Sequence, residues 1–190
     1  YQPLSFAHGW FVEPAYSYRR RSVPIFVDSD RVAELEVREQ GLQLDLGYMV
    51  TPNIMVGLYG SYAIVMLASK QKDLCDAAKV DCSASQIRVG LQGQYHLSPG
   101  QSLDPWFGLG FGLEMLDQKA GDTKSGVSGF EFVNIMAGAD FAATESIAVG
   151  PFVNFSVGQY SKTTGDNGAD IKDKAMHQWL TLGIKGTIGF

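Results

Sequence analysis

Five charged residues stand where they could form a buried polar network. Arg88 and Glu114 lie at similar heights on two neighbouring predicted strands, which would make them cross-strand neighbours. Glu13, Asp45 and Lys185 form a second group, on strands that adjoin if the sheet closes. Buried charges are tolerated when they are paired, so we interpret these residues as mutually neutralising pairs that plug an interior. A gated ion path or a proton site is the alternative.

Histidine and serine residues could supply a nucleophile and its base. His96 and Ser98 form a His-x-Ser sequence beside a short predicted turn, at the opposite end from the long polar segments. His177 and Ser161 lie at the end with the long segments, but nothing in the sequence places them within hydrogen-bonding distance, which a nucleophile and its base require. We therefore predict no catalytic residues.

The two cysteines, Cys75 and Cys82, have six residues between them in a polar segment. No histidine or second cysteine pair lies nearby, which argues against a metal site. We predict a disulfide bond in an oxidising compartment, with two free thiols as the alternative. Asp166, Asn167 and Asp170 resemble calcium ligands but lack the full spacing and the bidentate glutamate. The sequence therefore predicts no metal and no cofactor.

Arg19, Arg20 and Arg21 form a cationic cluster at the end of the first predicted strand. Guanidinium groups bind phosphate in a bidentate manner, so this cluster could contact phosphate groups. A solvated charged rim is the alternative.

The elements that must position these residues are strands, because alternation of apolar and polar residues recurs along the chain. The eight alternating segments are residues 8–20, 39–50, 54–67, 85–97, 105–116, 129–142, 147–160 and 180–190. Such a segment presents one face to an apolar medium and the other to a polar one. Pro14 and Pro151 lack the N–H group that a ladder needs, so we expect a bulge or a lost hydrogen bond at each.

The connections alternate between short and long. The short ones are residues 51–53, 98–104 and 143–146, and the long polar ones are about 21–38, 68–84, 117–128 and 161–175. The long connections therefore all fall at one end of an antiparallel meander, and both termini fall at the other. We expect one domain over residues 1–190, with 1–7 as an N-terminal segment.

Composition narrows the class of protein. The net charge of -5 argues against a nucleic-acid partner, and the 22 glycines and 12% aromatic residues fit β-structure. No run approaches the roughly 20 apolar residues of a transmembrane helix. No charged-then-apolar leader precedes Tyr1, so we expect a mature chain.

Three features carry a resemblance to a known family. They are the hairpin YMVTPNIMVGLY from Tyr48 to Tyr59, the strand start DPWFGLGFG from Asp104 to Gly112, and the terminal Phe190. They resemble the small eight-stranded outer-membrane barrels of the OmpA, OmpX and OmpW type, over essentially the whole chain. The resemblance implies an all-β, eight-stranded antiparallel up-and-down transmembrane β-barrel in a Gram-negative outer membrane, with periplasmic termini and external long loops.

The same resemblance bears on the last strand and on the aromatic residues. Ile188 and Phe190 would be a lipid-facing C-terminal signal, although Lys185 and Ile188 stand where the family prefers a glycine and an aromatic residue. Two groups of aromatic residues would form girdles at the two membrane interfaces. They are Trp10, Tyr48, Tyr95 and Phe190 at one level, and Tyr16, Tyr62, Tyr160 and Trp179 at the other.

The function expected from this architecture is that of a structural or interaction scaffold, not an enzyme. Its partners would be outer-membrane lipid, with lipopolysaccharide contacted by the arginine cluster, and other envelope proteins, through external loops or periplasmic turns. A narrow channel or a transporter of small hydrophobic ligands is the alternative, using a lumen lined on one side by Gly108, Gly110 and Gly112. A lipid-modifying barrel enzyme is a further alternative. A soluble lipocalin-like barrel would reverse the two faces of every strand.

Overall fold

The computed structural model describes residues 10–22, 38–66, 79–121, 123–164 and 176–189, together with Cys75, Ala77, Asp170, Ile171 and Lys174. No helix in this part of the chain is long and apolar enough to cross a membrane. Cys75 and Cys82 form the predicted disulfide bond.

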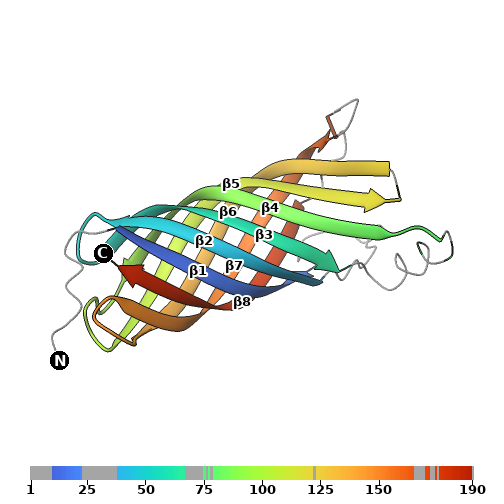
Figure 1. Ribbon diagram of the computed structural model, residues 1–190. Helices are drawn as coiled ribbons and strands as arrows, with labels where there is room; N and C mark the ends of the chain where they lie inside the picture. Colours follow the sequence, from blue (N-terminus) through green and yellow to red (C-terminus); the bar gives the residue numbers. More distant parts are fainter. Residues whose placement is uncertain are drawn as a thin grey trace.

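Eight strands follow one another around a closed antiparallel barrel (Figure 1). They are β1 (Trp10–Ser22), β2 (Arg38–Met49), β3 (Ile54–Met66), β4 (Cys82–His96), β5 (Leu103–Ala120), β6 (Thr123–Ala142), β7 (Ile147–Thr164) and β8 (Met176–Gly189). Each strand pairs with the next, and β1 pairs with β8 to close the ring, with Ser17 opposite Gly183. The eight strands predicted from the alternating segments, and the up-and-down barrel that the family resemblance implies, are confirmed.

The outer face of the barrel is apolar and its interior is polar. Leu42, Leu109 and Ile184 point outward and are 66%, 62% and 62% exposed, whereas Arg88 and Glu114 are completely buried. An apolar outside and a polar inside is the arrangement of a membrane barrel. It excludes the reversed faces of a soluble lipocalin-like barrel.

The connections partly follow the prediction. The short turns after β2, β4 and β6 are present, but the polar segment 117–128 is not the predicted loop. β5 runs to Ala120 and β6 starts at Thr123, and Lys119 and Lys124 pair across the hairpin. Gly121 takes a positive φ of 58°, which the tight turn requires. Above a membrane a strand can be polar on both faces, so alternation does not reveal it.

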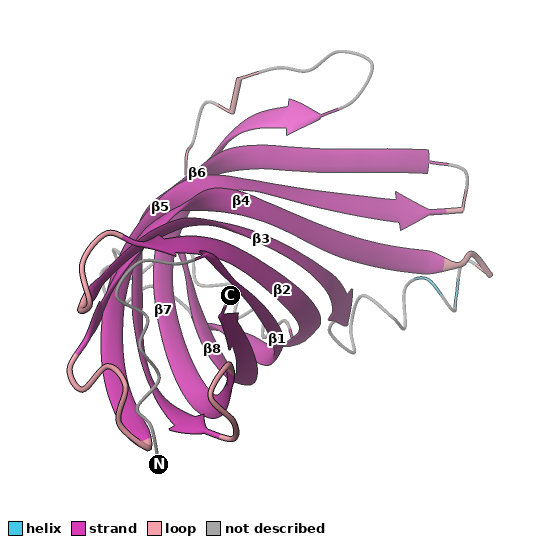
Figure 2. Ribbon diagram, turned by 60° about the vertical axis from the view of Figure 1, so that its left-hand side comes forward, coloured by secondary structure: helices cyan, strands magenta, loops and turns pink. Residues whose placement is uncertain are grey.

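This hairpin is part of an extension of the barrel wall. Figures 1 and 2 show that the loop-side ends of β4 to β7 reach beyond those of β1, β2 and β8. Most of the other three predicted loops, at 21–38, 68–84 and 161–175, lies outside the described residues.

Both prolines interrupt a ladder, as predicted. Between β1 and β8 no pairs form between Val12–Ile188 and Ala15–Lys185, the stretch that holds Pro14. Between β6 and β7 the gap lies between Gly138–Phe152 and Phe141–Val149, the stretch that holds Pro151. On their other sides both prolines keep the regular register, so each disrupts one ladder without opening the barrel.

The orientation of the faces can be tested with a charge on the apolar belt. Leu109→Arg places a guanidinium in the middle of the outer face of β5, and we expect it to lower the free energy of unfolding by about 2–4 kcal/mol in lipid vesicles. Urea unfolding followed by tryptophan fluorescence measures this change. Asp117→Arg, on the same face of the same strand beyond the apolar belt, should change stability little. Equal stability of the two variants would show that Leu109 does not face lipid.

Candidate functional site

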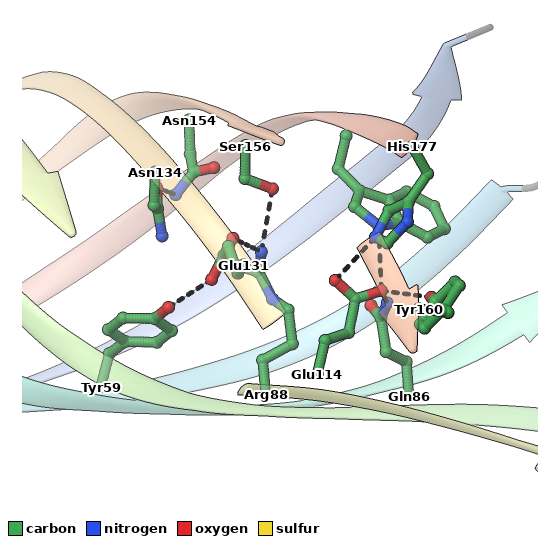
Figure 3. A network of polar contacts seen from close by, with 11 residues as sticks. Tyr59, Gln86, Arg88, Glu114, Glu131, Asn134, Asn154, Ser156, Tyr160 and His177 are labelled. Atoms are coloured by element: carbon green, nitrogen blue, oxygen red, sulfur yellow. Dashed lines mark hydrogen bonds and ion pairs between the residues drawn. The ribbon is translucent and has the colours of Figure 1, made fainter. Parts of the chain in front are cut away.

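The centre of the lumen holds an ion pair between Arg88 of β4 and Glu131 of β6, both completely buried (Figure 3). The Arg88 Nη1 group donates to one oxygen of Glu131 and to Ser156 Oγ of β7, the latter at 3.1 Å. The hydroxyl of Tyr59, on β3, donates to the other oxygen of Glu131. Three strands therefore meet at this carboxylate, and Arg88 links a fourth, β7, through Ser156. We call this group of four side chains the central node.

The predicted partner of Arg88 was Glu114. The two residues are indeed cross-strand neighbours in the β4–β5 ladder. Their side chains nevertheless have different roles, because Arg88 forms its ion pair with Glu131 while Glu114 joins a separate group of residues. The prediction of neighbouring positions is confirmed, and the ion pair that Arg88 forms is with Glu131.

Sequence reasoning missed Glu131 because a β-bulge changes the phase of β6. Strict alternation with Val133 and Ile135 would point Glu131 outward. A register shift lies between Glu131 and Val133, so that Phe132 and Val133 are both exposed and Glu131 points inward. The sequence contains the signal: Phe130 and Phe132 are apolar at even positions, whereas Val133 and Ile135 are apolar at odd positions.

Glu114 of β5 forms a second group of contacts on the loop side of the central node. One of its oxygens accepts hydrogen bonds from Gln86, Tyr160 and Trp179, and the other lies 3.1 Å from His177 Nε2. The rings of Tyr160 and His177 stack with their centroids 4.2 Å apart. We call this group of five the upper node (most of it is visible in Figure 3).

The upper node corrects the predicted aromatic girdle. Trp179 is 1% exposed and Tyr160 is half-buried, and both donate to a carboxylate inside the barrel instead of facing the membrane interface. The alternation along each strand could have shown this. Trp179 and Lys185 both have odd numbers on β8, and Tyr160 and Asn154 both have even numbers on β7, so each pair lies on one face of its strand. Lys185 and Asn154 point inward.

Lys185 of β8 forms a third group, which we call the lower node. Its Nζ lies 3.8 Å from Asp140, 3.4 Å from Gln94 Oε1 and 3.7 Å from the centre of the Trp106 ring. The Trp106 indole donates to Asp140 at 3.1 Å. A buried ammonium next to a carboxylate and an aromatic face is well compensated.

The predicted group of Glu13, Asp45 and Lys185 is only partly described. The backbones of Glu13 and Asp45 pair in the β1–β2 ladder, and Asp45 accepts a hydrogen bond from Gln43 at 2.9 Å. The side chain of Glu13 lies outside the described part of the structure, as do those of Arg19, Arg20 and Arg21 and the whole of Phe190. Ile188 is 42% exposed on the outer face. Asp140, the described acidic partner of Lys185, was missed by sequence reasoning.

The candidate catalytic residues have other partners. His96 Nδ1 lies 2.8 Å from Asp104, and Ser98 contacts the same carboxylate through its backbone N–H at 2.9 Å. His177 belongs to the upper node. In the described part of the chain, no group of three or more His, Cys, Asp or Glu side chains could hold a metal ion. Asp166 and Asn167 lie outside the described residues.

Large side chains fill the space beside the inward-facing glycines. A Cβ atom on Gly112 would lie 2.5 Å from the Tyr59 hydroxyl, and one on Gly138 would lie 2.5 Å from the Trp106 ring. Met136 lies beside Gly108 in the same way. The glycines therefore make room for side chains of the lumen.

Comparisons with known proteins agree with this architecture. A family model described as "Outer membrane protein beta-barrel domain" matches residues 6–180. The crystal structure of Neisserial surface protein A is similar with a TM-score of 0.66 at 10% identity, over 95% of this chain and 97% of that one. OprG from Pseudomonas aeruginosa gives 0.60 at 14% identity, over 96% of each chain. A major outer membrane protein from Thermus thermophilus gives 0.56 at 12% identity, over 97% of this chain and 100% of that one. No curated protein sequence matches, and at these identities the solved structures show a shared fold.

The partner of Arg88 can be tested by paired substitutions. Arg88→Met leaves Glu131 buried beside no cation, and we expect a loss of about 3–5 kcal/mol in the free energy of unfolding. Adding Glu131→Gln should restore most of the stability, because the glutamine is neutral and still accepts from Tyr59. The matched control adds Glu114→Gln instead and should restore clearly less, because Glu114 keeps its four other partners when Arg88 is replaced. If Glu114→Gln restored as much stability as Glu131→Gln, the partner of Arg88 would be Glu114, as their cross-strand positions suggest.

A glycine substitution distinguishes a filled lumen from an empty one. Gly112→Ala places a methyl group 2.5 Å from the Tyr59 hydroxyl and 2.4 Å from the Val89 carbonyl oxygen. We expect overpacking to lower stability by about 1–3 kcal/mol in urea unfolding. Gly60→Ala, whose Cβ would meet nothing within 4 Å, is the control and should be nearly neutral. Stabilisation by Gly112→Ala would instead indicate an unfilled cavity.

Proposed function

The chain belongs to the outer membrane protein β-barrel family, and from this premise we propose that it is a closed scaffold that spans a bacterial outer membrane with its termini on the periplasmic side. In this proposal the lumen is a structural plug, and the external face contacts a partner or a surface. The lumen residues Arg88, Glu114, Glu131, Asp140 and Lys185 then serve stability.

The central node is the observation that carries the proposal. Glu131 of β6 is bound at once by Arg88 of β4 and Tyr59 of β3, and Arg88 continues to Ser156 of β7. An eight-stranded barrel has an interior just wide enough for its own side chains. A chain of contacts that reaches from one wall to the other leaves little room for an ion or a solute.

The upper and lower nodes support the same proposal. Glu114 is surrounded by four donors, and Lys185 by an acid, an amide and an indole ring. Tyr59 lies beside Gly112, Met136 beside Gly108 and Trp106 beside Gly138, which supports a filled lumen over a conduit.

We also propose that the chain is not an enzyme. Both described histidines, His96 and His177, lie against carboxylates, and neither has a serine hydroxyl among its described hydrogen bonds. The similar solved structures are outer-membrane proteins and are not named as enzymes.

The contact surface in this proposal is the loop end of the barrel. The Cys75–Cys82 disulfide bond lies there and braces the segment before β4. The wall formed by the extended ends of β4 to β7 presents further backbone and side chains above the membrane. Envelope proteins, lipid and lipopolysaccharide are the proposed partners, the last through Arg19, Arg20 and Arg21.

Conductance in planar lipid bilayers tests the plug. We expect the wild-type barrel to show no discrete conductance steps, because the three nodes close the lumen. A variant with Tyr59, Arg88 and Glu131 all changed to alanine removes three side chains of the central node and serves as the positive control. Steady conductance steps from the folded wild-type barrel would contradict the proposal of a closed scaffold and would support a narrow channel.

A further inference from the structure

The outer face of β5 marks where the protein leaves the membrane. Its outward residues are apolar from Phe107 to Met115 and are followed by Asp117 and Lys119, all on one side of the strand. The apolar stretch from Phe107 to Met115 fits the 9–11 residues that a tilted strand needs to cross the hydrocarbon core. The external membrane boundary therefore lies near Met115, and Asp117 and Lys119 lie just above it.

Two lysines face each other at this boundary. Lys119 of β5 and Lys124 of β6 are directly paired in the ladder, so their exposed side chains lie on the same face of the hairpin. Like charges in this relation are destabilising. Among the described residues neither lysine forms an ion pair. An anion held between the two ammonium groups would offset their repulsion.

A groove of about 630 Å³ lies next to the lysine pair on the outer wall. At its membrane end it is lined by Tyr62 and Ile64, which are 52% and 60% exposed. At its other end it is lined by polar residues, among them Lys119 and Lys124. The ladders place these parts in order. Tyr62 pairs with Ile87 and Ile87 with Met115, so Tyr62 lies level with the membrane boundary, whereas Ile64 lies level with Asp117 through Ser85, one repeat below Lys119. The groove is thus apolar where it enters the membrane and cationic where it leaves it.

We propose that this groove binds a phosphorylated lipid of the external leaflet. The phosphate lies between Lys119 and Lys124, and an acyl chain lies against Tyr62 and Ile64. A soluble phosphate would use the lysines and leave the apolar end empty, whereas an uncharged lipid would use the apolar end and leave the lysines repelling each other. The site is distinct from the arginine cluster on β1, and it does not depend on whether the lumen conducts.

Asp117 also lines the groove and gives the proposal a sharp test. Asp117 precedes Lys119 by two residues on the same face of β5, so its carboxylate lies nearer the membrane and repels an approaching phosphate. The two lysines outweigh it by one positive charge. Removing Asp117 should therefore strengthen binding, while removing the lysines weakens it.

Native mass spectrometry of the whole barrel in detergent micelles measures lipid binding directly. The probes are bisphosphorylated lipid A, the same lipid without phosphates, and inorganic phosphate. We expect the Lys119→Gln/Lys124→Gln variant to bind bisphosphorylated lipid A about five- to tenfold more weakly than the wild type, the ratio expected when two exposed ion pairs are lost. Asp117→Asn should bind it more tightly than the wild type.

The matched control is Lys162→Gln/Lys174→Gln, which removes two exposed lysines of the loop end that lie outside the groove. It should bind like the wild type. Equal binding of the two lipids, or equal weakening by the two double variants, would overturn the proposal, because the lysine pair would then not recognise phosphate. Binding of inorganic phosphate as tight as that of lipid A would overturn the role of the apolar end. A wild-type conductance, by contrast, would refute the plug and leave this site unaffected.

Discussion

The hydrocarbon of a membrane offers no hydrogen-bonding partner to a peptide group, and this constraint determines most of the structure. Every strand must be paired on both sides, so the sheet has to close, and β8 returns to β1. Closure with eight strands produces a narrow interior. The faces then divide, with leucine, phenylalanine and isoleucine outside and polar side chains inside. Even Pro14 and Pro151, which lack an N–H group, are accommodated by interrupting one ladder each.

A narrow polar interior shielded from water creates its own requirement, because each buried charge must find compensation from other side chains. Three nodes meet this requirement at three levels, around Glu131, Glu114 and Lys185. Most of the partners come from strands that are not neighbours in the sheet, so the contacts tie opposite walls together. The β-bulge at Phe132 has a direct part in this, since it turns Glu131 from the lipid face to the lumen. The interior consequently acts as a core, made of polar groups in place of apolar ones.

Beyond the membrane boundary the constraint is absent, and the chain follows different rules. The hairpin of β5 and β6 continues as paired strands through Lys119 and Lys124, although neither face is apolar there. The change of medium along one strand places apolar, acidic and cationic groups in sequence on the outer wall. Such a gradient suits an amphipathic lipid, and it arises because one sheet passes through two solvents.

The sequence by itself determined the architecture, because the period of two and the segregation of long segments depend only on neighbouring residues along the chain. It placed all eight strands, the three short turns, the disulfide bond and the adjacency of Arg88 and Glu114. Tertiary structure alone decided the partners of the charges. Arg88 reaches Glu131 two strands away, and Glu114 meets Trp179 across the lumen, contacts that depend on closure, on strand tilt and on a bulge that shifts one strand by a residue. The alternation along one strand shows which face a residue lies on, but not which residue it meets across the lumen. For that reason the strands could be predicted and the nodes could not.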